Sequence, residues 1–458
     1  MASDCVYQQC IRADCGATFG VAEVLTACPS CGELLDVRYD WDRLPVPASL
    51  KDFEARWADR ADALNFSGVW RFRELLNFCE DRFKTTLGEG QTILEPNTAI
   101  AEYVGAAGGS VFLQYEGLNP SGSFKDNGMA AAFSHARQVG ANRVACASTG
   151  NTSASMSLYA AHLGMQAVVF VGSGRIAFGK LAQALDYGGL TIQIEGDFDA
   201  CMRRVAEASK RLGMYLMNSV NPFRLEGQKA IMYRVLEALR WEVPDWIVVP
   251  GGNLGNSSAF GKAFAELRTL GLIHRIPRLA VINSTGADTL NRLVNVKGLT
   301  FNQGRYDHDA IAADWRWQDE TELHPHTIAS AIEIARPVNA AKCLRALEVC
   351  DGVVRAVPDS AIMDAKAQVG RRGLGCEPAS AASVAGLKQL IAEGVIGADE
   401  RIVCILTGHV LKDPDATVGY HIGDYKPDKR VAGERPFANL PIQVVDDIEK
   451  ICQAIESR

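Results

Sequence analysis

The sequence has no apolar run of the roughly 18 residues that a membrane-spanning helix requires. Its first ten residues lack the charged start and the apolar stretch of a secretory signal peptide. It also has no repeat at the periods of solenoid proteins and no low-complexity tract. These absences argue against a membrane protein, a secreted protein and a repeat protein. We therefore expect a globular protein of the cytoplasm, without a membrane partner.

Positive charge is scarce as well. The 47 Lys and Arg residues are outnumbered by 54 Asp and Glu residues, which gives a net charge of -7 at pH 7. Binding to a phosphate backbone needs clustered Lys and Arg, so we expect no nucleic-acid partner. A small anionic substrate is still compatible, because a pocket inside an acidic protein can be basic. The 458 residues suffice for two to four units of roughly 100–200 residues each.

Thirteen cysteines without a secretory signal indicate reduced thiols or metal ligands. Five fall within the first forty residues: Cys5, Cys10, Cys15, Cys28 and Cys31. The pairs Cys10/Cys15 and Cys28/Cys31 are each followed by glycine and resemble a zinc ribbon, although the first pair is widely spaced and Cys5 competes as a ligand. A metal-free arrangement is the alternative. Zinc held by four cysteines would be structural, because no coordination position stays open.

Short apolar runs alternate with amphipathic stretches from residue 110 onward. The predicted buried strands are 110–115, 143–147, 167–171, 190–195, 246–249, 279–283, 353–357 and 402–407. The predicted helices between them are 128–138, 153–163, 200–212, 228–239 and 259–269. This alternation predicts crossover units and parallel sheets, in which ligands bind beyond the carboxyl ends of the strands. Residues 52–83 predict a connecting helix, and residues 301–327 a long loop or insertion.

A lysine motif follows the first of these strands. Residues 116–126 read Glu-Gly-Leu-Asn-Pro-Ser-Gly-Ser-Phe-Lys-Asp, in which Asn-Pro and Ser-Gly are turn sequences. Ser123 is a good N-cap, which places Lys125 in the first turn of a helix. The helix dipole disfavours an ammonium group there and so favours the neutral, nucleophilic amine. Taken alone, the motif also fits a solvated lysine on an ordinary helix.

Polar turns follow three further strands. Residues 148–152 (Ser-Thr-Gly-Asn-Thr) offer hydroxyl and N–H donors to an anion, unless they form only a routine capped turn. Residues 250–256 (Pro-Gly-Gly-Asn-Leu-Gly-Asn) allow a phosphate to approach the backbone closely. Residues 407–414 follow the last strand. In addition, Arg224 can grip a phosphate or a carboxylate, or it can be neutralised by a nearby acid.

Together these motifs resemble fold-type II pyridoxal-phosphate (PLP) enzymes, and threonine synthases most closely. The resemblance runs from about residue 86 to about residue 414, with five motifs in the family's order. Dehydratases of this fold usually have consecutive glycines where this chain has Gly-Asn-Leu-Gly-Asn at 252–256. The resemblance implies an α/β fold of two parallel-sheet domains with PLP between them.

The resemblance also implies roles for individual residues. Lys125 is implied as the Schiff-base lysine and the catalytic base. The implied cofactor contacts are Asn151, Gly251, Gly252, Asn253, Leu254, Gly255 and Thr407. The implied substrate contacts are Ser148, Thr149 and Thr152 for a carboxylate, and Asn218, Ser219, Arg224 and Asn256 for a phosphate. Glu377 lies in a matching stretch without an assignable role, and His409 and Lys412 are either structural or near the site.

The implied reaction converts O-phospho-L-homoserine and water into L-threonine and phosphate. Three alternatives stay open: a cysteate synthase that uses O-phosphoserine and sulfite, a threonine dehydratase, and a non-catalytic PLP-binding homologue whose ribbon is an interaction module. We expect a zinc-ribbon-like segment at 1–45, and connecting helices with the start of the large domain at 46–127. A small α/β domain at 128–235 and a large PLP-binding domain at 236–458 follow. We expect a homodimer that acts on a small phosphorylated amino acid.

Overall fold

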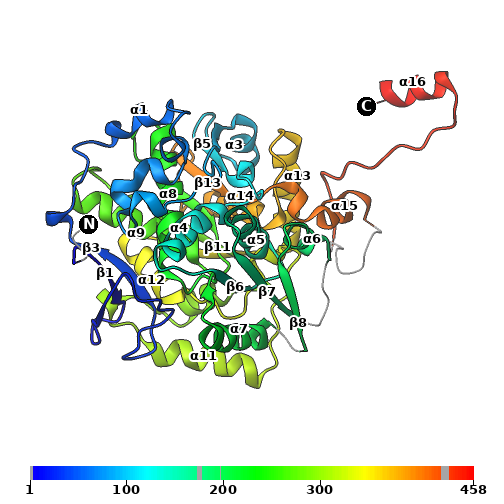
Figure 1. The fold of residues 1–458 in the computed structure, drawn as a ribbon. Helices are drawn as coiled ribbons and strands as arrows, with labels where there is room; N and C mark the ends of the chain where they lie inside the picture. The colour runs from blue at the N-terminus through cyan, green and yellow to red at the C-terminus, as the bar shows by residue number, and fades with distance from the viewer. Residues whose placement is uncertain (1–3, 173–177, 196–197, 424–432, 458) are drawn as a thin grey trace.

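The computed structural model describes residues 4–172, 178–195, 198–423 and 433–457, and three sheets organise this part of the chain. The N-terminal sheet is antiparallel, in the order β2-β1-β3. Its strands are β1 (Val6–Cys10), β2 (Thr18–Gly20) and β3 (Leu35–Tyr39). In Figure 1 this sheet lies at the N-terminal side of the body, and the C-terminal helix α16 (Ile448–Glu456) projects away on the other side.

A six-stranded sheet has the order β12-β11-β10-β13-β5-β4, and all its pairs are parallel except β4 with β5. Its strands are β4 (Ile93–Pro96), β5 (Val111–Tyr115), β10 (Trp246–Pro250), β11 (Arg278–Ser284), β12 (Val353–Val357) and β13 (Ile402–Leu406). All residues of β10 and β13 are buried. Parallel strands covered on both faces appear as continuous apolar runs, which is why the sequence predicts them.

The third sheet has four parallel strands in the order β8-β7-β6-β9. They are β6 (Arg143–Ala147), β7 (Gln166–Gly172), β8 (Leu190–Ile194) and β9 (Tyr215–Leu216). All eight predicted strands are therefore present, and β1 to β4 and β9 are additional. Two sheets of mainly parallel strands with helices between them confirm the predicted α/β fold class.

Helices cover both parallel sheets (Figure 1). The predicted helices correspond to α4 (Lys125–Gln138), α5 (Asn151–Leu163), α7 (Phe198–Leu212), α8 (Pro222–Ala238) and α9 (Gly255–Thr269). Further helices are α3 (Thr98–Val104), α6 (Phe178–Asp186), α12 (Ala340–Val349), α13 (Asp359–Arg371), α14 (Pro378–Ala392) and α15 (Pro414–Ile422). Helix α8 packs between α4 and α9. In the described ranges, none of the helices combines the length and the apolar character needed to cross a bilayer.

Three local predictions are wrong. The expected loop at 301–327 contains helix α11 (His308–Glu320), capped by the Asp307 side chain, which accepts a hydrogen bond from Ala310 N at 2.8 Å. The expected connecting helix at 52–83 is a series of short turns, in which the longest helical piece is Trp70–Leu76. Ser123 does not cap α4: the N-cap residue is Phe124, and the Ser123 hydroxyl is buried without a partner among the described residues.

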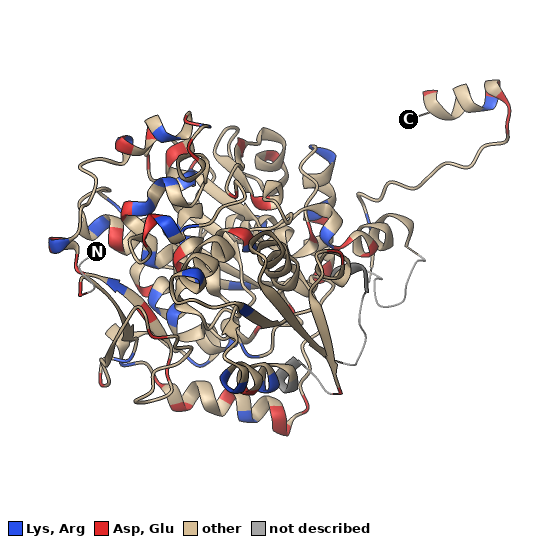
Figure 2. Ribbon diagram, in the orientation of Figure 1, with Lys and Arg blue, Asp and Glu red and all other residues tan. Residues whose placement is uncertain are grey.

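Charged residues of both signs are intermingled over most elements in Figure 2. One group of charges is buried where strand β3 meets α9 and α12. The Asp36 carboxylate on β3 lies 2.6 Å from Arg345, 3.5 Å from Lys342 and 4.0 Å from Lys262. Burial alone would raise the pKa of Asp36, but these cations hold it well below its usual value. Tyr39 on the same strand donates to Glu226 of α8 at 2.6 Å. The N-terminal sheet is thus built into the body by buried ionic contacts.

We expect Asp36→Ala to destabilise the protein by about 3–5 kcal/mol, because it leaves three cations facing a buried space without their carboxylate. The measurement is the midpoint of urea unfolding or the thermal unfolding temperature. Asp14→Ala is the matched control, since Asp14 belongs to the same segment but pairs with Arg12 at the surface. Equal stability of the two variants would contradict this account of the interface.

Candidate active site

One cavity of about 1260 Å³ lies beyond the carboxyl ends of β5, β6, β10 and β13. The predicted site residues that line it are Lys125, Ser148, Thr149, Asn151, Thr152, Asn218, Ser219, Arg224, Gly252, Asn253, Leu254, Gly255, Asn256 and Thr407. His409 and Lys412 line it too. The structure therefore brings together, from both parallel sheets, nearly all residues that the motifs single out. Gly251 is the one predicted cofactor contact that does not line the cavity.

The turn that carries Lys125 is held by its own polar side chains. Asn119 accepts from Gly90 N at 2.8 Å, and its amide donates to the buried Glu116 carboxylate at 2.8 Å. Asp126 accepts from Ser121 N at 2.6 Å and from the Ser155 hydroxyl. These contacts explain why a motif with Asn, Ser and Asp at these positions folds into one fixed turn before α4.

Lys125 is the first residue of α4 and is only partly exposed. Burial lowers the pKa of its amine to about 7, the Arg224 charge adds to the decrease, and Glu377 opposes it. The Nζ atom lies 4.1 Å from the centroid of the Phe124 ring. At neutral pH a large fraction of this amine is therefore unprotonated, which is the nucleophilic form.

Helix α8 brings Arg224 toward Lys125 through a close contact with α4. A Cβ atom at Gly128 would lie 2.8 Å from Arg224 Cγ, so glycine is required for this approach. The guanidinium donates to Met217 O at 2.7 Å and to the Thr152 hydroxyl at 3.3 Å, and its buried Nε has no partner.

No carboxylate among the described residues forms an ion pair with Arg224, so it is not an arginine neutralised by a nearby acid. Burial lowers its pKa to about 10, which still leaves it charged at neutral pH. The cavity therefore contains a buried cation that is available to an anionic ligand.

The loop after β6 is fastened to the segment before α8. Asn218 accepts from Ala147 N at 3.0 Å and donates to Ala147 O at 3.0 Å. The hydroxyl of Ser148 accepts from Gly150 N at 3.1 Å, just before α5 begins at Asn151. Asn218, Thr149 and Thr152, whose side chains can donate hydrogen bonds, all line the cavity. The arrangement suits an anionic group of a ligand.

The glycine-rich loop leads into α9, whose N-terminus lines the cavity. Leu254 has φ of 63°, an uncommon conformation for a residue with a side chain, and α9 begins at Gly255. A Cβ at Gly252 would lie 3.1 Å from Ile332 Cα, and one at Gly255 would lie 3.0 Å from Gln228 Oε1. Helix N-termini attract phosphate groups through free N–H groups and the helix dipole.

Gly251 and Asn256 have different environments in this loop. Gly251 N donates to Ile282 O at 2.7 Å, and Gly251 O accepts from the Asn283 amide at 2.7 Å. Gly251 therefore supports the loop from behind. The Oδ1 atom of Asn256 is buried and has no hydrogen-bond partner among the described residues, so it can accept a hydrogen bond from a ligand.

Thr407 and the buried Glu377 form the floor of the cavity beside Asn151. Glu377 accepts from the Asn151 amide at 2.9 Å and from the Thr407 hydroxyl at 3.2 Å. Sequence analysis assigned no role to Glu377, because these bonds join residues that are far apart along the chain. It also missed Gln228 and Gln183, which line the cavity from α8 and α6 without any local motif.

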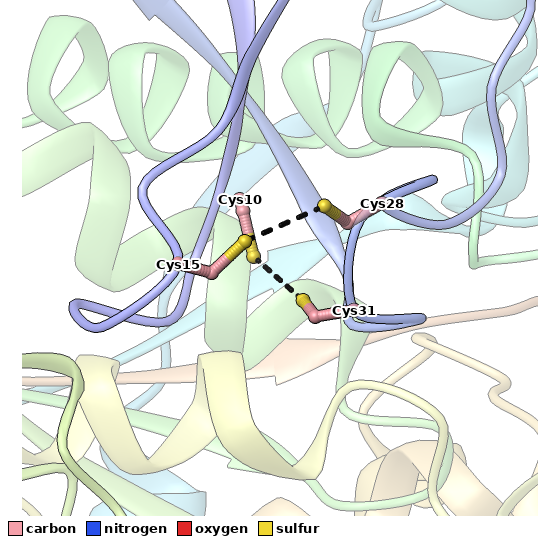
Figure 3. A group of neighbouring side chains, drawn as sticks. All are labelled: Cys10, Cys15, Cys28 and Cys31. Atoms are coloured by element: carbon pink, nitrogen blue, oxygen red, sulfur yellow. Dashed lines mark hydrogen bonds between the residues drawn. The ribbon is translucent and has the colours of Figure 1, made fainter.

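The four predicted zinc ligands form a separate cluster (Figure 3). The ligand atoms of Cys10, Cys15, Cys28 and Cys31 all lie within 4.8 Å of one another. The Cys10–Cys31 and Cys15–Cys28 sulfur distances are 3.5 and 3.8 Å. Four thiolates bound tetrahedrally at 2.3 Å from zinc would be about 3.8 Å apart. Cys5 is outside this cluster, so it does not compete as a ligand in this arrangement.

Known proteins resemble the chain over most of its length. A family profile described as pyridoxal-phosphate dependent enzyme matches residues 85–408. The threonine synthase of Methanocaldococcus jannaschii is 40% identical over 412 residues, which cover 90% of this chain and 94% of that protein. The threonine synthase of Methanosarcina acetivorans is 38% identical over 406 residues, covering 88% and 92% of the two chains. The chain belongs to the threonine synthase family.

Solved structures agree with the fold of this threonine synthase family member. A threonine deaminase from Solanum lycopersicum has a TM-score of 0.55 at 17% identity, covering 73% of this chain and 87% of that one. An L-serine ammonia-lyase from Rhizomucor miehei has a TM-score of 0.56 at 18% identity, covering 69% and 93%. At such low identity these neighbours support the fold alone. The resemblance to threonine synthases given by the motifs is confirmed.

Proposed function

We propose that the protein converts O-phospho-L-homoserine and water into L-threonine and phosphate, with PLP as its cofactor. Membership of the threonine synthase family supports this activity. The observation that carries it is the buried Arg224 guanidinium, which has no carboxylate partner in the described ranges and lines the same cavity as Lys125. A buried cation without a protein counter-charge is expected to bind an anion, and the substrate's phosphate is one.

The residues around Lys125 fit PLP. The amine has a pKa of about 7, so its neutral form, which attacks an aldehyde, is available at physiological pH. The N-terminus of α9, where Gly252 and Gly255 carry no Cβ that would crowd the loop, suits the cofactor's phosphate. When bound, PLP supplies an aldehyde that forms a Schiff base with an amine, and a ring that withdraws electrons from the substrate's Cα.

Within this proposal the protein's own groups bind the cofactor and move protons. Lys125, once its amine is free, removes the proton from Cα, and a pKa near neutrality suits a group that must accept and release a proton. Asn151 and Thr407, with residues 252–255, are the proposed cofactor contacts. Thr407 presents a hydroxyl, which unlike a carboxylate does not force full protonation of a pyridine nitrogen.

The substrate contacts divide into two groups. Arg224 is proposed to hold the phosphate, together with Asn218, Ser219 and Asn256. The hydroxyls of Ser148, Thr149 and Thr152 are proposed to hold the α-carboxylate. The position of all seven around one cavity supports this division. A fixed phosphate grip keeps the leaving group oriented while the Cα proton is removed.

The activity is tested with purified protein reconstituted with PLP. We expect threonine and phosphate in equal amounts from O-phospho-L-homoserine. Parallel reactions contain O-phosphoserine with sulfite, and threonine alone. Phosphate release only in the reaction with sulfite, or ammonia release only from threonine, would contradict the proposed reaction and favour a cysteate synthase or a dehydratase.

We also propose that Cys10, Cys15, Cys28 and Cys31 bind one structural zinc ion. The sulfur distances support this, because they are close to those of a tetrahedral zinc site. Four protein ligands leave no open position, so zinc would stabilise the N-terminal sheet and take no part in the reaction.

We expect one zinc ion per chain in metal analysis of the protein, and its loss in Cys28→Ser, because three thiolates bind zinc more weakly than four. Cys5→Ser is the matched control, since this buried cysteine lies outside the cluster. Chelation is expected to lower the unfolding temperature of the wild type but not that of the zinc-free variant. Equal zinc content in both variants would contradict the ligand set.

The domain boundaries, the homodimer and the cytoplasmic location also stay proposals. The range 128–235 contains the strands of the four-stranded sheet, which supports it as the smaller unit. No disulfide joins the cysteines within the described ranges, which supports a reducing compartment. Light scattering in solution tests the dimer.

A further inference from the structure

Glu377 lies in the cavity wall with a carboxylate that helix capping does not use. It is the N-cap residue of α14, and its side chain makes no capping hydrogen bond. It is 4% exposed, and within the described residues no Lys or Arg forms a salt bridge with it. A Cβ at Gly408 would lie 2.5 Å from Glu377 Oε1, so glycine at 408 leaves the space that this carboxylate occupies. A buried carboxylate held in this way needs an explanation beyond helix initiation.

The two groups bound by this carboxylate come from different sheets. Asn151 begins α5 after β6 of the four-stranded sheet, and its amide donates to both Glu377 oxygens, at 2.9 and 3.2 Å. Thr407 follows β13 of the six-stranded sheet, and its hydroxyl lies 3.2 Å from Glu377 and 3.0 Å from the Ser380 hydroxyl. One carboxylate therefore fixes two of the proposed cofactor contacts relative to each other.

The charged groups around Glu377 include the proposed reactive lysine. Lys412 and Lys125 face its carboxylate from η9 (Val410–Lys412) and from α4, and Cys376 adjoins it. Burial holds the pKa of Glu377 above its usual value, although Asn151, Lys412, Thr407 and Lys125 act in the opposite direction. Lys125 itself is faced by Arg224 and Glu377. Glu377 is thus the negative charge that acts on the Lys125 amine.

We infer that Glu377 is a positioning residue, which holds the Asn151 amide and the Thr407 hydroxyl for the cofactor and keeps a negative charge beside the nitrogen of Lys125. This inference rests on the proposed cofactor site. A carboxylate there stabilises the protonated form of a nitrogen bonded to the cofactor, so it favours the form that is more reactive toward the substrate's amine.

The test is a pH titration of the visible absorbance of the PLP-reconstituted protein, which reports protonation of the nitrogen shared by Lys125 and the cofactor. Glu377→Gln keeps the shape and one acceptor oxygen but removes the charge. We expect its titration midpoint to lie about 1 pH unit or more below that of the wild type. The two curves are expected to converge at low pH, where Glu377 is protonated in the wild type.

Two further variants complete the experiment. Glu322→Gln removes an exposed carboxylate that lines the same cavity, and we expect the wild-type midpoint. Glu377→Asp keeps the charge, and we expect its titration midpoint to lie close to that of the wild type. It can be compared with Glu322→Gln even if the Gln variant at 377 does not fold. A wild-type midpoint in Glu377→Gln, with normal cofactor absorbance, would overturn the inference and leave the proposed function intact. Absence of cofactor absorbance in the wild type would overturn both.

Discussion

Replacing Lys125 with alanine is expected to abolish threonine formation from O-phospho-L-homoserine. The variant loses the amine that anchors the cofactor and the base that removes the Cα proton, and no neighbouring group in the described cavity has the same position. Removal of a residue with both a covalent and a proton-transfer role lowers kcat by about 10³- to 10⁶-fold. Steady-state phosphate release measures this loss.

The fold of Lys125→Ala is expected to stay intact, because the side chain makes no hydrogen bond or salt bridge to any described residue that would stabilise the turn. Circular dichroism and the unfolding temperature check this point. Lys51→Ala is the matched control, since Lys51 is exposed and remote from the cavity wall. Activity of Lys125→Ala close to that of the control would exclude Lys125 as the reactive amine.

Replacing Arg224 with methionine is expected to reduce kcat/KM for O-phospho-L-homoserine by roughly 30- to 5000-fold. This range corresponds to the about 2–5 kcal/mol lost when one partner of a buried charged contact is removed. Methionine keeps the length and the packing of the side chain against α4, so the loss reports the missing charge. Inhibition by inorganic phosphate is expected to weaken in parallel, because it depends on the same cation.

Arg224→Lys separates charge from geometry. Lysine restores the charge but not the planar pair of N–H donors that now reach Met217 O and Thr152, so we expect a partial recovery. The affinity for PLP is expected to change little in both variants, whereas Arg204→Met, on the surface of α7, is expected to leave all three measurements unchanged. Wild-type kinetics in Arg224→Met would show that the phosphate binds elsewhere.

The sequence predicted the parallel sheets because their central strands are buried on both faces. The five residues of β10 and of β13 are apolar, which gives two uninterrupted apolar runs. Helix α11 was missed for the opposite reason. Its buried face includes Asp314 and Gln318, and Asp314 is neutralised by Arg292 at 2.8 Å. Such pairing is invisible to hydrophobic periodicity, although Asp307 was a readable cap.

Site residues could be predicted where one turn contains them and the residues that hold them in place. Roles that depend on contacts between residues far apart along the chain could not be predicted. The Lys125 turn is stabilised by Asn119 and Asp126 within the same motif, so the local sequence contains the information. The role of Glu377 depends on Asn151, 226 positions away along the chain. Likewise, only the folded structure reveals that Arg224 has no carboxylate partner in the described ranges.

The N-terminal segment is more closely integrated than an interaction module would be. Its strand β3 supplies the carboxylate for three buried cations and two carbonyl groups that accept from Lys262 and Lys342. Removal of the segment would take the Asp36 carboxylate from Lys342 and Arg345 and uncover part of α8 and α9, the helices that carry Arg224 and Asn256. We therefore interpret it as part of the scaffold of the active site.

The identity of the reactive amine is tested most directly by reducing the PLP-reconstituted protein with borohydride and mapping the modified peptide by mass spectrometry. Hydride transfer converts the carbon–nitrogen double bond into a stable single bond, so the cofactor stays on the lysine that held it. We predict a phosphopyridoxyl group on Lys125. Modification of Lys412 instead, or no modified lysine at all, would contradict the account.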